Sequence, residues 1–276
     1  MRSTPKSATS VRPRSTLSAG IPAFTIVLAL LAGAFFTLPF IALLADITWS
    51  DLPELLTSKS ALDALWLSLR TATAATVICV FLGVPLALVL ARTNFPGRTL
   101  MRSIVLVPLV TPPVVAGILL TEAFGRRGLI GEQLSAVGMN IAFTTAAVVI
   151  AQTFVSLPFM VTTLESHLGS SGEHYERVAQ SLGSSKWRTF RTITLPLLRP
   201  GLISGTVLTF ARALGEFGAT VTFAGSLQGT TRTMPLEIYL ARETDPNSAV
   251  ALSLVLILVA IVVIGIAYFR PTTRHQ

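Results

Sequence analysis

The chain has 276 residues, of which 51% are hydrophobic and only 12% are charged. A soluble domain carries about 25% charged residues, so this chain has too few charges to cover a globular surface in water. Its net charge of +8 would suit a nucleic-acid partner, but the basic residues lie between apolar stretches, as in membrane proteins. Composition therefore excludes a soluble domain and favours an integral membrane protein that does not bind nucleic acid.

Six apolar stretches approach the length of about 20 residues that a membrane-spanning helix needs. They are Ile21–Ala45, Thr71–Ala91, Ser103–Thr121, Ile141–Leu164, Gly201–Phe223 and Pro246–Phe269. The third is short and contains Pro108 and the pair Pro112-Pro113. Proline removes a backbone donor, so such a break accompanies either a transport pathway or a packing kink. The sequence predicts an all-α integral membrane protein with six transmembrane helices.

The two ends of the chain differ from its apolar middle. Residues 1–20 are rich in Ser, Arg, Pro and Thr, and we expect them to form a disordered cytoplasmic arm. The apolar stretch that follows has 25 residues, against about 7–15 in a secretory signal, so it is interpreted as a retained first helix. Residues 21–270 are then the transmembrane domain, and residues 271–276 are a short cytoplasmic tail.

The distribution of basic residues predicts the orientation in the membrane. With six spans, both termini lie on one side, together with segments 92–102 and 165–200. Segments on that side, termini included, hold fourteen of the 21 Lys and Arg residues, the opposite side holds six, and Arg212 lies within a span. Because cytoplasmic loops carry the excess of Lys and Arg, both termini are predicted to be cytoplasmic.

The chain offers no set of residues for catalysis or metal binding. A single cysteine, Cys79, excludes an internal disulfide and is interpreted as a small buried hydrophobe. The histidines His167, His174 and His275 do not have the spacing of a metal site. The phosphate-binding pattern Gly-x-x-x-x-Gly-Lys-[Ser/Thr] does not occur. We therefore expect no catalytic residue, metal or cofactor in this chain.

The loop between the fourth and fifth spans has the pattern of two short helices. A capping box that begins at Ser170 opens the first helix, and Gly183 can adopt the left-handed conformation that closes it. Ser184 or Ser185 can cap the second helix, and Pro196 is predicted to end it.

One face of the first short helix is apolar. Tyr175, Val178, Ala179 and Leu182 follow the spacing i, i+3, i+4 and i+7. An apolar face in a cytoplasmic loop must be covered, either by the protein's own helices and the membrane surface or by another protein.

The residues of this loop resemble a known family. The spacing Ala179-x-x-x-Gly183-x9-Ile193-x-Leu195-Pro196 is similar to the EAA loop of permease subunits in binding-protein-dependent ABC importers. The resemblance implies the type I permease architecture, with a coupling loop whose first helix inserts into a groove of a cytoplasmic ATPase.

The resemblance also implies which residues meet the ATPase. They are Glu176, Val178, Ala179, Leu182 and Gly183. One position departs from the family pattern, because its glutamate falls on Arg177 here while Glu176 lies one place earlier.

Further stretches resemble the oxyanion branch of the family. They are Leu106–Pro113, Phe124–Gly128, Ala211–Thr220, Phe223–Gly225 and Thr231–Tyr239, and they look like those of molybdate permeases, with sulfate permeases as near relatives. This resemblance implies that two copies of the chain form a homodimer, which is embedded in the lipid of the cytoplasmic (inner) membrane. It also implies two copies of a separate ATPase that binds ATP and magnesium, and an external solute-binding protein that delivers the anion.

Two charges lie within the fifth predicted span. With a start near Pro200, Arg212 lies about 18 Å and Glu216 about 24 Å along a helix that rises 1.5 Å per residue. Both positions fall inside a hydrocarbon core of about 30 Å. A charge at the centre costs at least about 2.5–3.5 kcal/mol, so each needs a cavity or a partner.

The surrounding polar residues follow the same helical face. At about 100° per residue, Gly205, Thr209, Arg212, Glu216 and Thr220 share one stripe of a continuous helix. The stripe is interpreted as the wall of a translocation pathway. The residues predicted to line this pathway are Thr209, Arg212, Glu216 and Thr220. The alternative is an i,i+4 ion pair that locks two helices together.

Three other functions would also account for some of these features. A sulfate or tungstate permease of the same family has the same motifs. A secondary transporter driven by an ion gradient would explain the intramembrane charges but not the paired cytoplasmic helices, and inverted repeats are not visible. A membrane-embedded enzyme would need an acid, base and metal set that the sequence does not offer.

Overall fold

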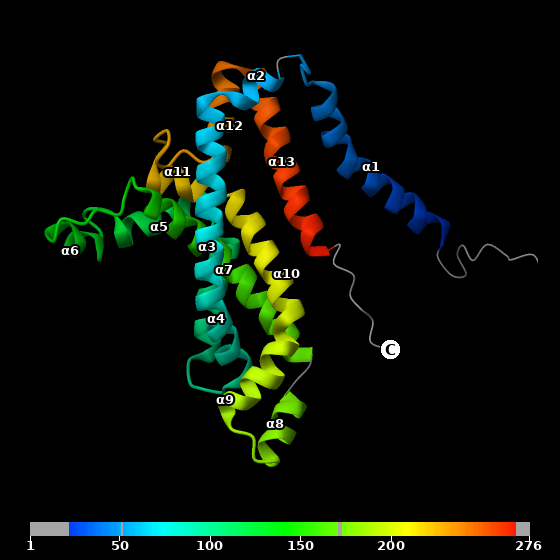
Figure 1. Ribbon diagram of the computed structural model, residues 1–276, viewed down its shortest axis with the longest axis vertical. Coiled ribbons are helices and arrows are strands. Elements are labelled where there is room, and N and C mark those ends of the chain that lie inside the picture. The colour runs from blue at the N-terminus through cyan, green and yellow to red at the C-terminus, as the bar shows by residue number, and fades with distance from the viewer. Residues whose placement is uncertain (1–21, 51, 171–172, 269–276) are drawn as a thin grey trace, which may run out of the picture. The chain divides into compact units, whose positions relative to one another are not determined.

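The structure, a computed structural model, describes residues 22–50, 52–170 and 173–268 (Figure 1). Every regular element in these ranges is a helix, which confirms the predicted all-α class for them. The predicted arm (1–20) and tail (271–276) lie outside the described residues. The chain divides into two units, Met1–Asp46 and Ile47–Gln276, which are described separately.

The first unit contains helix α1, Ala23–Ala45. It is 23 residues long, and none of its residues is buried. Phe35 is 74% exposed and Phe36 is 69% exposed. A helix that is apolar on every side belongs in lipid or against other membrane helices, which agrees with its prediction as a span.

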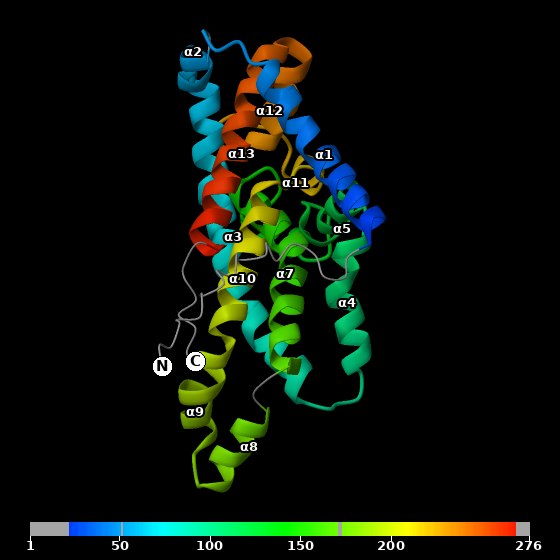
Figure 2. The same cartoon turned by 90° about the vertical axis from the view of Figure 1, so that its right-hand side faces the viewer.

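The second unit is a bundle built on three long helices, α3, α7 and α10 (Figure 2). Its elements are α2 (Leu52–Thr57), α3 (Lys59–Arg92), α4 (Arg98–Val110), α5 (Pro113–Phe124), α6 (Gly131–Ala136), α7 (Thr145–Ser170), α8 (Glu173–Ser181), α9 (Lys186–Thr189), η1 (Phe190–Thr194), α10 (Leu195–Leu214), α11 (Gly218–Ala224), α12 (Met234–Thr244) and α13 (Pro246–Tyr268). Helices α8 and α9 lie at one end of this bundle, and α2 and α12 lie at the other (Figure 1).

Helices α3 and α7 pack in parallel through small residues. Cys79 is fully buried and donates its thiol proton to the carbonyl of Thr153 at 3.6 Å, as expected for a small buried residue. One turn further on, a Cβ added to Gly83 would lie 2.7 Å from Cγ of Met160. Small residues let membrane helices approach closely, because no hydrophobic effect drives them together in lipid.

Helix α10 packs against α7 in the opposite direction. A Cβ on Gly201 would lie 2.7 Å from the ring of His167, and one on Gly205 would lie 3.0 Å from the sulfur of Met160. As residue numbers rise along α10 they fall along α7. This register places Ser156 of α7 at the level of Thr209, one turn beyond Gly205.

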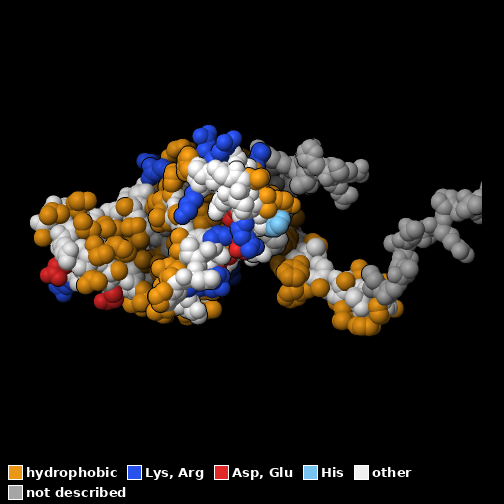
Figure 3. All heavy atoms as spheres, turned by 90° about the horizontal axis from the view of Figure 1, so that it is seen from below, with side chains coloured by type: hydrophobic (Ala, Val, Ile, Leu, Met, Phe, Trp, Pro, Cys, Tyr) orange, Lys and Arg blue, Asp and Glu red, His pale blue; other side chains and the backbone are white. Residues whose placement is uncertain are grey.

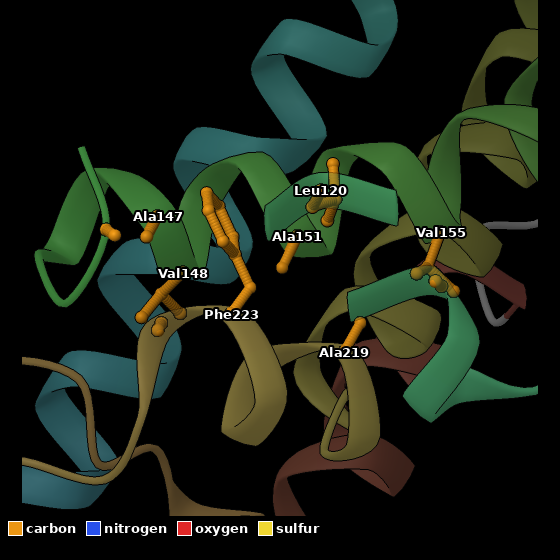
Figure 4. Close-up of a cluster of buried hydrophobic side chains, with 10 residues drawn as sticks. Leu120, Ala147, Val148, Ala151, Val155, Ala219 and Phe223 are labelled. Carbon is orange, nitrogen blue, oxygen red and sulfur yellow. The ribbon is translucent and has the colours of Figure 1, made fainter. Parts of the chain in front are cut away.

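A compact apolar core joins α5, α7 and α11 (Figure 4). Val148, Ala151 and Val155 of α7 face Ala219 and Phe223 of α11, and all are nearly inaccessible. This core holds two short helices, α5 and α11, against the long α7.

The predicted third span is divided into two helices at the proline pair that the sequence marked as a break, whereas Pro108 lies inside a helix. Helix α4 ends at Val110 and α5 begins at Pro113. Thr111 is extended (φ −74°, ψ 128°) because the ring of the following proline disfavours the helical conformation. Pro113 then starts α5, where its missing N–H costs nothing.

Five helices in the described residues are long and apolar enough to cross a membrane. They are Ala23–Ala45, Lys59–Arg92, Thr145–Gly169, Lys186–Leu214 and Pro246–Gly265. The predicted count of six is not confirmed, because the third stretch is divided between α4 and α5.

The fifth span also differs from its prediction. It begins earlier, since α9 continues through the π-helix η1 into α10, and Pro196 does not end it. It stops at Leu214, so the expected single helix over Gly201–Phe223 was wrong. Three residues, 215–217, separate α10 from α11.

Candidate functional site

Arg212 and Glu216 form an ion pair at the break between α10 and α11. Nη1 of Arg212 lies 2.6 Å from Oε2 of Glu216. The Glu216 side chain is 1% exposed and that of Arg212 is 27% exposed. The pairing agrees with the i,i+4 spacing in the sequence, although Glu216 lies beyond the end of the helix. Its backbone N–H still reaches the carbonyl of Ala213 at 3.2 Å, which preserves a final helical turn.

Glu216 also makes a second charge-assisted contact. Its other oxygen, Oε1, accepts a hydrogen bond of 2.8 Å from the backbone N–H of Ala219 in the first turn of α11. A carboxylate at this position satisfies a helix N–H that has no intrahelical partner. The buried charge is thus compensated by one guanidinium and one backbone donor, as a buried carboxylate requires.

The two interrupted spans meet next to this pair. A Cβ on Gly218, the first residue of α11, would lie 2.5 Å from Cβ of Pro113, the first residue of α5. One turn on, a Cβ on Gly117 would lie 2.5 Å from Cβ of Thr222. Helices broken at membrane depth are found where backbone lines a pathway or is buried in protein.

The predicted pathway residues do not share one helical stripe. Thr209 lies on α10 and Thr220 on α11, and the break separates them, so the continuous stripe was wrong beyond Leu214. Both threonines are fully buried, and neither hydroxyl has a hydrogen-bond partner within the described residues. The structure brings Arg212 and Glu216 together and leaves the two threonines buried on separate helices.

Two buried polar residues near this site were missed by the sequence analysis. Gln152 and Ser156 of α7 are fully buried, and their side-chain polar atoms have no hydrogen-bond partner among the described residues. At 100° per residue Ser156 lies on the face of α7 that meets α10, and Gln152 lies between that face and the face that meets α11. The signal was present in the sequence, as an i,i+4 polar pair inside an apolar span.

At the opposite end, α8 presents the predicted apolar face to a groove. Gly183 closes α8 with φ of +85°, as predicted from its position. Val178, Ala179 and Leu182 line a groove of about 630 Å³. The remaining lining residues are His174, Tyr175, Thr192, Ile193, Pro196 and Leu197. Leu182 is 83% exposed, so nothing in the described chain covers this face.

Glu176 does not face the groove with the other predicted coupling residues. Its carboxylate points away from the groove, and Oε2 lies 3.2 Å from Nε of Arg92. Oε1 accepts a hydrogen bond of 2.9 Å from the hydroxyl of Thr194. Neither Arg92 nor Thr194 was singled out from the sequence, because their partner lies 84 and 18 residues away respectively.

A second ion pair ties α4 to α7 at the same end. Nη2 of Arg102 donates to Oε1 of Glu165 at 2.5 Å. This hydrogen bond, aided by the charge of the carboxylate, raises the pKa of the Arg102 guanidinium. The interrupted third span is therefore held to the core at its start by a charged contact.

The end of the bundle that carries α8 and α9 is strongly basic (Figure 3). Exposed residues there include Arg102, Lys186, Arg188, Arg191 and Arg199.

Among the described residues, no three His, Cys, Asp or Glu side chains are grouped so as to hold a metal ion.

Comparison with known families decides between the classes of membrane protein that this geometry fits. Residues 83–275 match the family described as "Binding-protein-dependent transport system inner membrane component". The chain belongs to this family of importer permeases. The loop pattern Ala179 to Pro196 had predicted the same family, and that prediction is confirmed.

Individual permeases are similar over most of the chain. The molybdenum transport system permease protein ModB of Mycobacterium tuberculosis is 53% identical over 254 residues, covering 91% of this chain and 96% of the relative. ModB of Escherichia coli K12 is 42% identical over 205 residues, covering 74% and 90%. The sulfate permease CysT of the same organism is 34% identical over 255 residues, covering 91% and 90%.

Solved permease structures share the fold. A bacterial ABC transporter that imports the acidic polysaccharide alginate has a TM-score of 0.70 at 18% identity, covering 88% of this chain and 93% of its own. The MetNI methionine ABC transporter has a TM-score of 0.59 at 16% identity, covering 74% and 91%. These likenesses place the helices of this permease in the ABC importer arrangement.

Proposed function

We propose that this permease is the membrane-embedded subunit of an ATP-driven importer that carries molybdate across the cytoplasmic membrane. The observation that carries the proposal is the 53% identity to mycobacterial ModB over 254 residues, nearly the whole of both chains. The sulfate permease CysT covers the same share of this chain at 34% identity. This difference favours molybdate, and tungstate has the same charge and shape as molybdate.

The proposed assembly contains two copies of this chain and two copies of a separate ATPase. The apolar groove of α8 and η1 is open and uncovered, as a docking surface for another subunit would be. The sequence lacks the phosphate-binding loop of an ATPase. ATP and magnesium would thus be bound by the partner, and an external solute-binding protein would deliver the anion.

The cytoplasmic side is proposed to be the end that carries α8 and α9. Its exposed basic residues support this orientation, because Lys and Arg are retained on the cytoplasmic side. Both termini would then be cytoplasmic.

The proposed pathway passes Arg212 and Glu216, with Thr209 and Thr220 beside them. Arg212 is the partly exposed member of the pair, and its planar guanidinium binds carboxylates and oxyanions alike. A passing dianion would compete with Glu216 for the two Arg212 side chains of a dimer. The hydroxyls of Thr209 and Thr220, which have no hydrogen-bond partner among the described residues, would donate to the carboxylate that the anion displaces.

Uptake in proteoliposomes tests the proposed function. The permease is reconstituted with an ABC ATPase and a solute-binding protein from the same organism, and uptake of labelled molybdate is measured with and without ATP. We expect ATP-dependent uptake that tungstate inhibits and a tenfold excess of sulfate leaves largely intact. Uptake that needs an ion gradient but no ATP would contradict the proposal, and preferential sulfate uptake would assign the CysT substrate instead.

A further inference from the structure

A single carboxylate joins α8 to the helices of the membrane domain. Both oxygens of Glu176 are engaged, with Oε2 at 3.2 Å from Nε of Arg92 and Oε1 at 2.9 Å from the hydroxyl of Thr194. Nη2 of Arg92 also donates to Oε1 at 3.4 Å. The Arg92 and Glu176 side chains are only 19% and 14% exposed. A pair so shielded from water is held more strongly than one on the surface.

Four elements meet at this contact. Arg92 is the last residue of α3, Thr194 is the last residue of η1, and Glu176 lies on α8. Nη1 of Arg92 reaches into α7 as well, where it donates to the carbonyl of Leu168 at 3.1 Å. Among the described residues of α8, Glu176 is the side chain with hydrogen bonds to the membrane helices.

The π-helix contributes one of these contacts. In η1 the chain takes a wider turn, and the N–H of Leu195 bonds back to the carbonyl of Phe190. Thr194, the last residue of this turn, is 6% exposed, and its hydroxyl donates to Glu176. Single π-turns inside α-helices are frequent at functional sites.

Helix α3 can carry a displacement from this end to the other. Its 34 residues, Lys59–Arg92, span about 51 Å at 1.5 Å per residue. Near its far end, the hydroxyl of Ser68 accepts a hydrogen bond of 2.7 Å from the N–H of Met234, the first residue of α12. Arg92 and Ser68 thus connect α8 with α12 through one continuous helix.

We propose that Glu176 and Arg92 fasten α8 to the end of α3, so that the two helices move as one body during transport. This inference rests on the proposed function, in which the ATPase moves α8. Glu176 then acts as a positioning residue that does not touch the ATPase. The apolar residues of α8 that line the groove receive the movement, and Glu176 transfers it to α3 and, through Ser68, to α12.

The chain contains a matched control on the same helix. Arg177 and Glu173 form an i,i+4 pair of 3.9 Å whose side chains are 70% and 63% exposed. Within the described part of the chain, this pair lies inside α8 and has no ion pair or hydrogen bond to another element. Glu173→Gln therefore makes the same chemical change as Glu176→Gln without touching the link to α3.

The first test measures molybdate transported per ATP hydrolysed by the reconstituted complete importer. We expect Glu176→Gln to copurify with the ATPase at the wild-type yield and to hydrolyse ATP, while the transport ratio falls about three- to tenfold. Glu173→Gln should keep the wild-type ratio. Equal ratios in both variants would overturn the inference, as would loss of the ATPase from Glu176→Gln alone.

The second test uses a covalent link in place of the ion pair. Arg92→Cys and Glu176→Cys are combined and joined by a short bis-maleimide. Cys79 is buried and fully inaccessible, and a chain carrying Cys79 alone serves as the control for its labelling. The unlinked double variant should have a lowered ratio, and crosslinking should restore transport. Arrest of transport by the crosslink would show that α8 and α3 must separate, which would overturn the inference.

A variant in the groove tests the proposed function separately from the inference. Ala179→Asp places a charge in the groove and should remove the ATPase from the purified complex. If wild-type permease and Ala179→Asp both lack a bound ATPase, the proposed function is wrong. If the wild-type permease binds the ATPase and Glu176→Gln leaves the ratio of molybdate transported to ATP hydrolysed unchanged, only the inference is wrong.

Discussion

Glu216 is a charged side chain with almost no access to solvent. Its buried negative charge is balanced by a single cationic side chain, that of Arg212. Its carboxylate is 1% exposed, with Arg212 at 2.6 Å and the N–H of Ala219 at 2.8 Å. Removing one partner of a buried ion pair costs about 3–5 kcal/mol, because the other charge is left uncompensated. Loss of transport in Arg212→Ala alone would thus not separate a structural role from a role in the pathway.

A double substitution separates the two roles. Arg212→Ala should lower uptake more than Glu216→Gln, and Arg212→Lys should restore part of it. In Arg212→Ala/Glu216→Gln no buried charge is orphaned, so the yield of folded permease should recover. We expect uptake to stay low in this double variant, since the anion still lacks its guanidinium. Recovery of uptake together with folding would assign the pair a purely structural role.

At the scale of elements, the contact between α5 and α11 depends on two glycines. A Cβ on Gly218 would meet Cβ of Pro113 at 2.5 Å, and the proline ring cannot turn aside. Overpacking of this kind costs about 1–3 kcal/mol. The two broken helices therefore approach each other as closely as their backbones allow.

Alanine substitution measures this constraint. Gly218→Ala should lower the thermal midpoint of the detergent-solubilised permease, and Gly117→Ala should do the same, because its Cβ would meet Thr222 at 2.5 Å. Gly33→Ala in α1 is the matched control, since nothing lies within 4 Å of the added Cβ. It should be neutral or slightly stabilising, as alanine is favoured over glycine inside a helix. Equal midpoints in all three variants would contradict the tight contact.

The sequence predicted the elements that follow local rules and missed those set by tertiary contacts. Gly183 and Ser185 were recognised, because a positive φ of +85° and a cap on the N–H of Arg188 are local features. Pro112 and Pro113 marked a break, but their span was still counted as one helix. The end of α10 at Leu214 has no proline to announce it. It depends on Glu216 capping α11, which only the assembled fold makes visible.

In the candidate site, too, the sequence indicated the features that follow local rules and missed those set by tertiary contacts. Arg212 and Glu216 were identified because charges are rare at membrane depth, and their ion pair follows from i,i+4 spacing. Gln152 drew no attention as a neutral residue in an apolar stretch, although both ends of its buried amide lack a partner in the described chain. The link from Glu176 to Arg92 spans 84 positions, and no local pattern reports a contact of that range.

For the whole molecule, the arrangement of the second unit makes the topology testable. The N–H of Met234 bonds Ser68 and the hydroxyl of Thr145 bonds the carbonyl of Thr230, so these segments share one end. Arg92 and Glu176 meet at the other end. A topology that separated the members of either group would break these contacts.

Reporter fusions check the orientation. Fusions after Arg98, near Lys186 and after Arg270 should report the cytoplasm. Those near Lys59, Arg127 and Arg232 should report the opposite side, because the positive-inside rule retains the basic α8–α9 end in the cell. A reporter near Lys186 scored outside would contradict both the topology and the docking of an ATPase on α8.

The neutral pairing of Arg212 with Glu216 has a consequence for the electrical state of the membrane. A cell interior that is negative by 100 mV opposes entry of a dianion by about 4.6 kcal/mol and favours its escape by the same amount, at about 2.3 kcal/mol per charge. An unpaired arginine in an idle pathway would attract cytoplasmic anions and let them leak outward. With Glu216 at 2.6 Å, each Arg212 is already neutralised. A permease without substrate would then not conduct anions out of the cell, and the membrane potential would be maintained. Glu216→Gln should therefore increase anion efflux through an importer that is not transporting.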